Sequence, residues 1–325
     1  MHKPEVLKKL KQHLQTAMML ELSTLPPYLC AMWSIHGTSE HAVQVKKFIL
    51  SIVQEEMLHL SMACNILNAI GGNPVLNEPS IHPVFPCSLP GHSKTNNAFM
   101  VELNKCCPQS IETFLKIELP GEIFGNKHHH DGWCTIGEFY DEITALLKSE
   151  TLDDSDFNNG RQVGNKYNPA KGILYEVHSR ADALKALEEI IDQGEGHSGK
   201  MFDKDHQLTH YWKFRSVYDL MQNEIWNFHN EVYQMAANPH ESSFPEEAKK
   251  LNKQFNIAWS ELLDELNTAF NDETPSLDKS IELMFHLKKP AVALMQIPLT
   301  GKNGNAGPTF SYISFREKSR IEGNS

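Results

Sequence analysis

Glu56 and His59, in the stretch Glu56-Met57-Leu58-His59, are residue types that bind metal ions, and both stand inside an apolar helical stripe. The stripe steps by three or four residues and marks one buried helix face, comprising Ile49, Ile52, Glu56, His59, Ala63, Ile66 and Ile70. A carboxylate on a buried face needs a partner, because burying an unpaired charge is costly. Glu-x-x-His pairs in helical bundles bind pairs of iron or manganese ions, together with single glutamates from other helices. The stretch therefore predicts a two-metal site if the chain supplies further ligands.

Two single glutamates are candidates for those ligands. Glu21 falls on an apolar stripe of an earlier predicted helix, with Leu14, Met18, Leu25 and Tyr28. Glu138 follows Thr135, which can cap a new helix. Glu142 lies one turn after Glu138 and competes with it for the same role.

The second glutamate and histidine pair is interrupted. Glu195 continues the stripe Leu184, Leu187 and Ile191, but Ser198 stands three residues later, where a histidine is needed. His206 and His210 are the nearest candidates. His210 is favoured because it begins the stripe His210, Phe214, Val217 and Met221.

The elements that must position these residues are mainly α-helices, separated by long excursions. Predicted helices cover 4–35 (kinked or broken by Pro26-Pro27), 39–70, 135–148, 180–193, from 205 to beyond 218, 245–270 and 277–295. The excursion 73–133 is predicted to contain a strand at 99–103 and a short helix at 108–116, and the excursion 150–180 a strand at 172–177. We divide the chain into a metal-binding bundle at 1–237, a helical extension at 238–298 and a flexible tail at 299–325.

The composition excludes several classes of function. A formal net charge of −11 over 325 residues argues against nucleic acid as a partner, because a phosphate backbone attracts basic surfaces. No apolar run is long enough to span a bilayer, and the first residues lack a secretory signal. Six cysteines in a chain of this length do not form a disulfide framework. We therefore expect a cytoplasmic enzyme.

Other ionisable residues have simpler interpretations. Glu55 is expected to face solvent or a neighbouring helix. The run His128-His129-His130-Asp131 is expected to form a solvated loop. Glu224 and His229 have the wrong spacing for a shared ligand face. The helices after residue 240 could cover the bundle or form a dimer contact, so a homodimer is one expectation.

Several motifs together resemble a known family. They are Leu20-Glu21-Leu22-Ser23-Thr24-Leu25-Pro26-Pro27-Tyr28-Leu29, Glu55-Glu56-Met57-Leu58-His59-Leu60, Cys64-Asn65-Ile66-Leu67-Asn68-Ala69-Ile70-Gly71-Gly72, Leu89-Pro90-Gly91, Thr135-Ile136-Gly137-Glu138-Phe139-Tyr140, and Gln193-Gly194-Glu195-Gly196 followed by His210-Tyr211-Trp212-Lys213-Phe214. Over residues 8–235 the chain resembles the ferritin-like domain of the iminophenyl-pyruvate dimer synthases of violacein and related bisindole pathways. The resemblance implies a ferritin-like four-helix bundle and a two-metal site with the ligands Glu21, Glu56, His59, Glu138, Glu195 and His210.

This ligand set indicates oxygen chemistry. Carboxylates and imidazoles suit two iron ions, or manganese, whereas thiolate ligands are absent from the set. We therefore expect a di-iron oxidase or oxygenase that uses dioxygen on a small, amino-acid-derived substrate in specialised metabolism. Oxidative coupling of two imino acids, as in the resembled family, is one alternative. A non-catalytic metal-binding or ferroxidase role is another, although a cage-forming storage subunit would have shorter loops.

Overall fold

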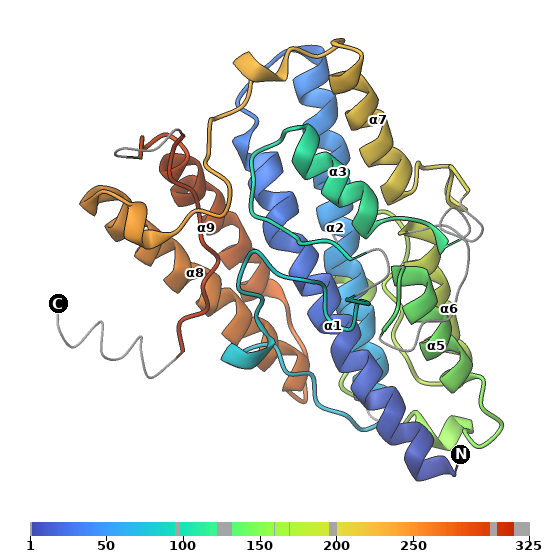
Figure 1. Ribbon diagram of the computed structural model, residues 1–325. Coiled ribbons are helices and arrows are strands. Elements are labelled where there is room, and N and C mark those ends of the chain that lie inside the picture. The colour runs from blue at the N-terminus through green and yellow to red at the C-terminus, as the bar shows by residue number, and fades with distance from the viewer. Residues whose placement is uncertain are drawn as a thin grey trace.

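Two long helices joined by a short turn form the centre of the molecule, α1 (Lys3–Ser34) and α2 (Glu40–Ala69) (Figure 1). The computed structural model describes residues 2–94, 98–121, 132–158, 160–168, 170–194, 200–299 and 304–314. Ser39 caps α2, since its hydroxyl accepts a hydrogen bond from the backbone N–H of Ala42 at 3.2 Å. Both helices agree with the predicted ranges within two residues.

α1 passes through Pro26-Pro27 without ending, so the alternative of a broken helix is wrong. A proline inside a helix costs about 3 kcal/mol, because a backbone hydrogen bond is lost. Every residue from 20 to 31 is buried in the core, and this packing offsets the cost. The Ser23 hydroxyl also donates to the carbonyl group of Leu20 at 2.7 Å, and the Thr24 hydroxyl oxygen lies 2.8 Å from the carbonyl oxygen of Glu21.

In the described part of the chain, four shorter helices complete the bundle as two split rods, α3 (Pro108–Ile117) with α5 (Ile136–Leu147), and α6 (Arg180–Gln193) with α7 (His210–Gln222). α3 packs on α7 and α5 packs on α6, while α2 contacts both α6 and α7 and α1 contacts α5. Figure 1 shows α3 and α7 beside one end of α1–α2, and α5 and α6 beside the other. Both split rods are therefore interrupted near the middle of the bundle.

A second helical layer packs against the bundle. α8 (Glu246–Asn271) and α9 (Asp278–Leu294) form a hairpin, and α9 contacts α1 (Figure 1). Asn68 of α2 donates to the Phe270 carbonyl at 2.7 Å, which attaches the end of α8 to the bundle. The helices after residue 240 therefore cover a face of the bundle, one of the two roles considered for them.

Residues 304–314 are folded, so the prediction of a flexible tail from residue 299 is wrong for this segment. The Phe310 side chain is 2% exposed. It stacks on Trp33 with ring centroids 6.2 Å apart and meets Phe255 and Trp259 edge-on at 4.9 and 5.1 Å. This aromatic group joins the end of the described chain to both α1 and α8.

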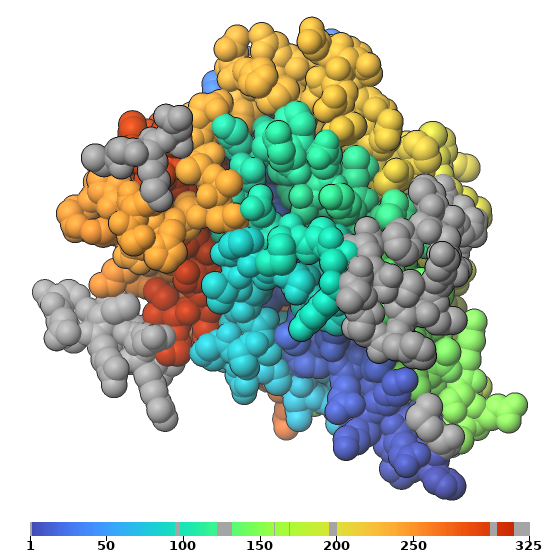
Figure 2. Space-filling model, viewed as in Figure 1, coloured from blue at the N-terminus to red at the C-terminus, as the bar shows by residue number. Residues whose placement is uncertain are grey.

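The excursions contain turns and isolated bridges instead of strands. In the described part of the chain the predicted strand at 99–103 is reduced to a single bridge between Cys87 and Val101, and no strand forms at 172–177. Short 3-10 turns occupy Pro79–Ile81, Asp154–Asp156, Asn165–Tyr167, Phe228–Asn230 and Glu241–Ser243. Figure 2 shows the segment after α2, in cyan and green, lying across the face between α1 and the C-terminal helices. Over the residues that the structure describes, no helix is both long and apolar enough to cross a membrane.

Candidate metal centre

Five buried ionisable side chains converge where the split rods are interrupted. Each is at most 3% exposed, and the set comprises Glu21 from α1, Glu56 and His59 from α2, Glu118 at the C-terminal cap of α3, and His210 at the first position of α7. Their potential ligand atoms form two groups, in each of which all atoms lie within 4.8 Å of one another. One group is Glu21, Glu56 and His59, and the other is Glu56, Glu118 and His210. Glu56 belongs to both, as expected of a carboxylate between two metal positions.

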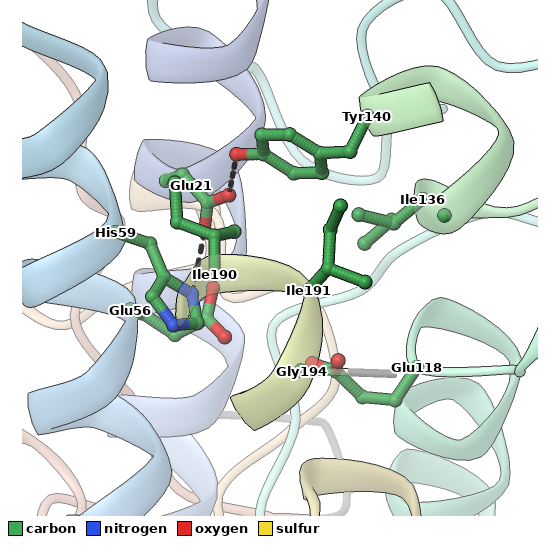
Figure 3. Close-up of a pocket in the computed structure, with 10 residues that line it drawn as sticks. Glu21, Glu56, His59, Glu118, Ile136, Tyr140, Ile190, Ile191 and Gly194 are labelled. Carbon is green, nitrogen blue, oxygen red and sulfur yellow. Dashed lines mark hydrogen bonds and ion pairs between the residues drawn. The ribbon is translucent and has the colours of Figure 1, made fainter. Parts of the chain in front are cut away.

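Hydroxyl groups hold the three carboxylates in place. The Tyr140 hydroxyl donates to Glu21, and the Tyr28 hydroxyl donates to Glu118. Figure 3 shows the Tyr140 ring reaching from α5 toward Glu21, at the edge of the cluster. The Thr24 hydroxyl donates to Glu56 Oε2 at 2.7 Å. Each carboxylate thus keeps an oxygen for a further partner while the other is fixed.

His210 has one ring nitrogen engaged and the other directed at the carboxylates. Its Nε2 lies 2.8 Å from Glu55 Oε2, and Lys213 Nζ lies 2.6 Å from the same oxygen. Its Nδ1 lies 3.0 Å from Glu56 Oε1 and 3.4 Å from Glu118 Oε2, yet has no aligned hydrogen bond to either. Burial lowers the pKa of His210, but Glu118, Glu55 and Glu56 raise it well above the ordinary value, so without metal the ring carries a proton on each nitrogen. A metal ion between Nδ1 and the carboxylates would take the place of the Nδ1 proton.

His59 has the same arrangement with a different acceptor. Its Nε2 lies 3.0 Å from Gln193 Oε1, and its Nδ1 lies 3.7 Å from Glu21 Oε2. The His59 and His210 rings stack with their centroids 5.6 Å apart. Both imidazoles therefore have Nδ1 toward the cluster and Nε2 toward a supporting side chain.

The electrostatics of the metal-free cluster are those of crowded, buried carboxylates. Burial raises the pKa of Glu21 to about 7, against the stabilising effect of its hydrogen-bonding partners. Burial and the neighbouring Glu21 also raise the pKa of Glu56, and burial lowers the pKa of His59. Divalent cations would favour the ionised carboxylates and neutral imidazoles that metal binding requires. The donor set of carboxylate oxygens and imidazole nitrogens therefore fits iron or manganese.

A small pocket with a volume of about 20 Å³ adjoins the cluster. Its acidic and imidazole side is formed by Glu21, Glu56, His59 and Glu118, and its other side by Ile136, Gly137, Tyr140, Ile190, Ile191 and Gly194. Figure 3 shows Ile136 and Ile191 between Tyr140 and Glu118, to the right of Glu21 and Glu56. These wall residues lie at the N-terminal end of α5 and the C-terminal end of α6, so the interruption of the rods creates the space beside the metal ligands.

The structure brings together Glu21, Glu56, His59 and His210 of the predicted ligands, but it places Glu138 elsewhere. Glu138 Oε2 accepts a hydrogen bond from the Cys134 backbone N–H at 2.8 Å, and its own N–H donates to the Thr135 hydroxyl at 3.2 Å. Glu138 is therefore part of the cap of α5, a role that matches its spacing of three residues from Thr135. Its competitor Glu142 is exposed and contacts His13 at 3.1 Å.

The other predicted residues have mixed outcomes. His206 is exposed in the turn before α7, so of the two alternatives His210 is the one at the cluster. Glu195 lies outside the described residues, as does the run 128–131. Glu55 is 3% exposed and contacts α7, so the expectation of a neighbouring helix holds and that of solvent does not.

Glu118 is the ligand candidate that the sequence reasoning missed. It follows a short helix inside a Pro-rich and Gly-rich excursion, where no long apolar stripe marks it. The available signal was local: Ile117 and Leu119 flank the carboxylate, and Pro120 ends the helix.

Comparison with known proteins identifies the family and the fold of the chain. A family model described as ferritin-like matches residues 14–219, more than half of the chain. The chain belongs to the ferritin-like family. Dichlorochromopyrrolate synthase of Lentzea aerocolonigenes is 23% identical over 90% of this chain, although the chain spans only 34% of that relative's length. The crystal structure of a ferritin-like protein from Caulobacter vibrioides shares the fold, with a TM-score of 0.72, 22% identity, and coverage of 94% of this chain and 98% of that one.

Proposed function

We propose that this protein is a di-iron oxidase or oxygenase, which uses dioxygen to oxidise a small, amino-acid-derived molecule in specialised metabolism. The observation that carries the proposal is the pair of ligand groups sharing Glu56, buried beside a pocket. Oxygen and nitrogen ligands of this kind suit iron, with manganese as the alternative metal. A bound pair of ferrous ions would supply the electrons that activate dioxygen.

The side chains of the chain divide the remaining tasks. Glu21, Glu56 and His59 would hold one metal ion, and Glu56, Glu118 and His210 the other. Ile136, Ile190 and Ile191 would exclude water from the reacting part of the substrate. An amine oxidised at this centre loses one C–H and one N–H bond and becomes an imine. The two electrons and two protons released reduce one dioxygen to hydrogen peroxide.

Oxidative coupling of two imino acids is a second candidate, favoured by the similarity to a relative named as a synthase. In that case the oxidised product would react with a second molecule before leaving the protein. The mass of the product separates the candidates, because coupling gives a dimer and simple oxidation does not.

Metal analysis with two matched variants tests the proposal. We expect about two iron ions per chain in protein reconstituted anaerobically with ferrous ion, and substrate-dependent oxygen consumption. Glu118→Ala should lower the iron content and abolish oxygen consumption, because it removes a ligand of one group. Glu138→Ala should retain both ions and lose only a helix cap, worth about 1 kcal/mol of stability. Metal loss in the Glu138 variant alone, or no metal in the unmodified protein, would refute this assignment.

A further inference from the structure

Gln193 contacts the candidate centre without being a ligand candidate. It is the last residue of α6, and its side chain is 4% exposed. Its amide nitrogen donates to the Lys171 carbonyl at 2.9 Å and to Glu189 Oε1 at 3.0 Å. Its amide oxygen lies 3.0 Å from His59 Nε2. The buried amide of Gln193 thus joins three residues, Lys171, Glu189 and His59.

The two acceptors fix which end of the amide faces His59. A carbonyl oxygen and a carboxylate oxygen can only accept hydrogen bonds, so both require the NH2 end of Gln193. The oxygen end must then face His59, and an oxygen acceptor requires that Nε2 of the imidazole carry the hydrogen. The neutral ring therefore presents the Nδ1 lone pair on the side of Glu21.

The residues around Gln193 prevent its side-chain amide from flipping by 180°, which would exchange the oxygen and the nitrogen. Glu189 is fully buried, and its other oxygen forms an ion pair with Lys204, in the segment before α7. Gly172 closes the other side: its φ is +99°, and a Cβ there would lie 2.3 Å from Gln193 Nε2 and 2.2 Å from Glu189 Oε1. Only glycine leaves room for the backbone to approach the amide so closely.

We propose that Gln193 is a positioning residue, which fixes His59 in the tautomer that directs Nδ1 at the metal pair. The inference deepens the proposed function and rests on it for the identity of the ligand. Without Gln193, Nε2 loses its acceptor, and the proton is better placed on Nδ1 facing the Glu21 carboxylate. That tautomer blocks the nitrogen that the metal needs.

The direct test is long-range 1H–15N NMR of the histidine rings in the metal-free protein. The unmodified protein should show His59 with its hydrogen on Nε2. Gln193→Met, which keeps the size but removes the acceptor, should shift the hydrogen to Nδ1.

Gln162→Met is the matched control. Gln162 is also buried, donates to the Asn65 carbonyl at 3.0 Å and accepts from the Val177 N–H at 2.9 Å, but it has no described contact with His59. The same substitution there should leave the His59 tautomer unchanged. A hydrogen on Nδ1 in the unmodified protein overturns the proposal without any variant, as does a hydrogen retained on Nε2 in Gln193→Met.

Anaerobic titration with ferrous ion supplies the second readout. Gln193→Met should weaken one of the two binding steps by about 10- to 100-fold, the usual effect of losing a histidine's outer hydrogen-bond partner. Gln162→Met should bind both ions normally. If the unmodified protein has the Nε2 tautomer but binds no iron, the proposed function fails while the positioning by Gln193 stands. If it binds two ions and Gln193→Met binds both equally well, the positioning role fails alone.

Discussion

Replacing Lys213 by methionine should destabilise the metal-free protein by about 3 kcal/mol. The Lys213 side chain is only 5% exposed, and its ammonium group lies 2.6 Å from Glu55 Oε2. Glu55 is equally buried and holds the outer nitrogen of His210 at 2.8 Å. The substitution keeps most of the aliphatic stem but leaves a buried carboxylate with one partner instead of two.

The magnitude follows from what remains after the change. Removing one partner of a buried ion pair usually costs about 3–5 kcal/mol, because the other charge stays buried. We expect the lower end of this range, since His210 still faces Glu55. Burial alone would raise the pKa of Glu55, yet His210 and Lys213 together lower it below the ordinary value. Their stabilisation of the carboxylate is present above the ordinary pKa and disappears as the pH falls through the folded-state value.

Chemical unfolding of metal-free protein near neutral pH is the assay, with Lys279→Met as the matched control. Lys279 pairs with Glu265 at 2.5 Å, but its side chain is 69% exposed, so its loss should leave the stability nearly unchanged. Combining Lys213→Met with Glu55→Gln should recover part of the lost stability, because the double variant no longer buries a charge at Glu55. A Lys213→Met protein within about 1 kcal/mol of the unmodified one would refute the reasoning, since a buried charge cannot lose its partner so cheaply.

Two further predictions concern pH and the end of the chain. Because the pKa of Glu21 is about 7 in the folded, metal-free protein, the folded state binds a proton that the unfolded chain has lost. As the pH rises from about 4.5 to 7, the free energy of unfolding should fall by about 3 kcal/mol more in the unmodified protein than in Glu21→Gln. Urea unfolding measures this difference, and parallel pH profiles of the two proteins would contradict the prediction. Phe310→Ala should cost about 3–5 kcal/mol in the same assay, because the ring is buried among aromatic side chains. Phe285→Ala, at a ring 78% exposed, should cost little, and equal losses at both positions would argue against the folded C-terminal segment.

Sequence periodicity predicted the half of the site that lies on α1 and α2. Glu21, Glu56 and His59 stand on long helices, where a spacing of three or four residues determines which side chains share a face. His210 was also identified, because α7 continues an apolar stripe from it. Periodicity places Glu55 on a different helix face from Glu56, but it could not decide whether that face meets solvent or a neighbouring helix. α2 packs against α7 as well as α1, and the side of α2 that carries Glu55 faces His210 and Lys213 of α7.

The remaining half depends on helix ends, which periodicity does not resolve. Glu118 and Glu138 stand on opposite sides of the interruption between α3 and α5, one at a C-terminal cap and one in a first turn. The spacing Thr135-x-x-Glu138 was a capping signal that competed with the ligand interpretation, and the cap is what the structure contains. The packing of the short helices on α1 and α2 decides whether Glu118 or Glu138 reaches the centre. This packing depends on contacts between residues far apart in the chain, which the local sequence does not encode.

The interruption of the rods accounts for both the centre and its pocket. Continuous helices in place of α3–α5 and α6–α7 would fill the space that Gly137, Ile191 and Gly194 now border. The interruption also gives the two ligand groups similar parts: a carboxylate held by a tyrosine, an imidazole, and the shared Glu56. They differ in the outer partner of the histidine, a neutral amide at His59 and a carboxylate at His210. A carboxylate partner makes an imidazole the stronger donor, so the two metal positions should differ in affinity even though their described ligands match in type.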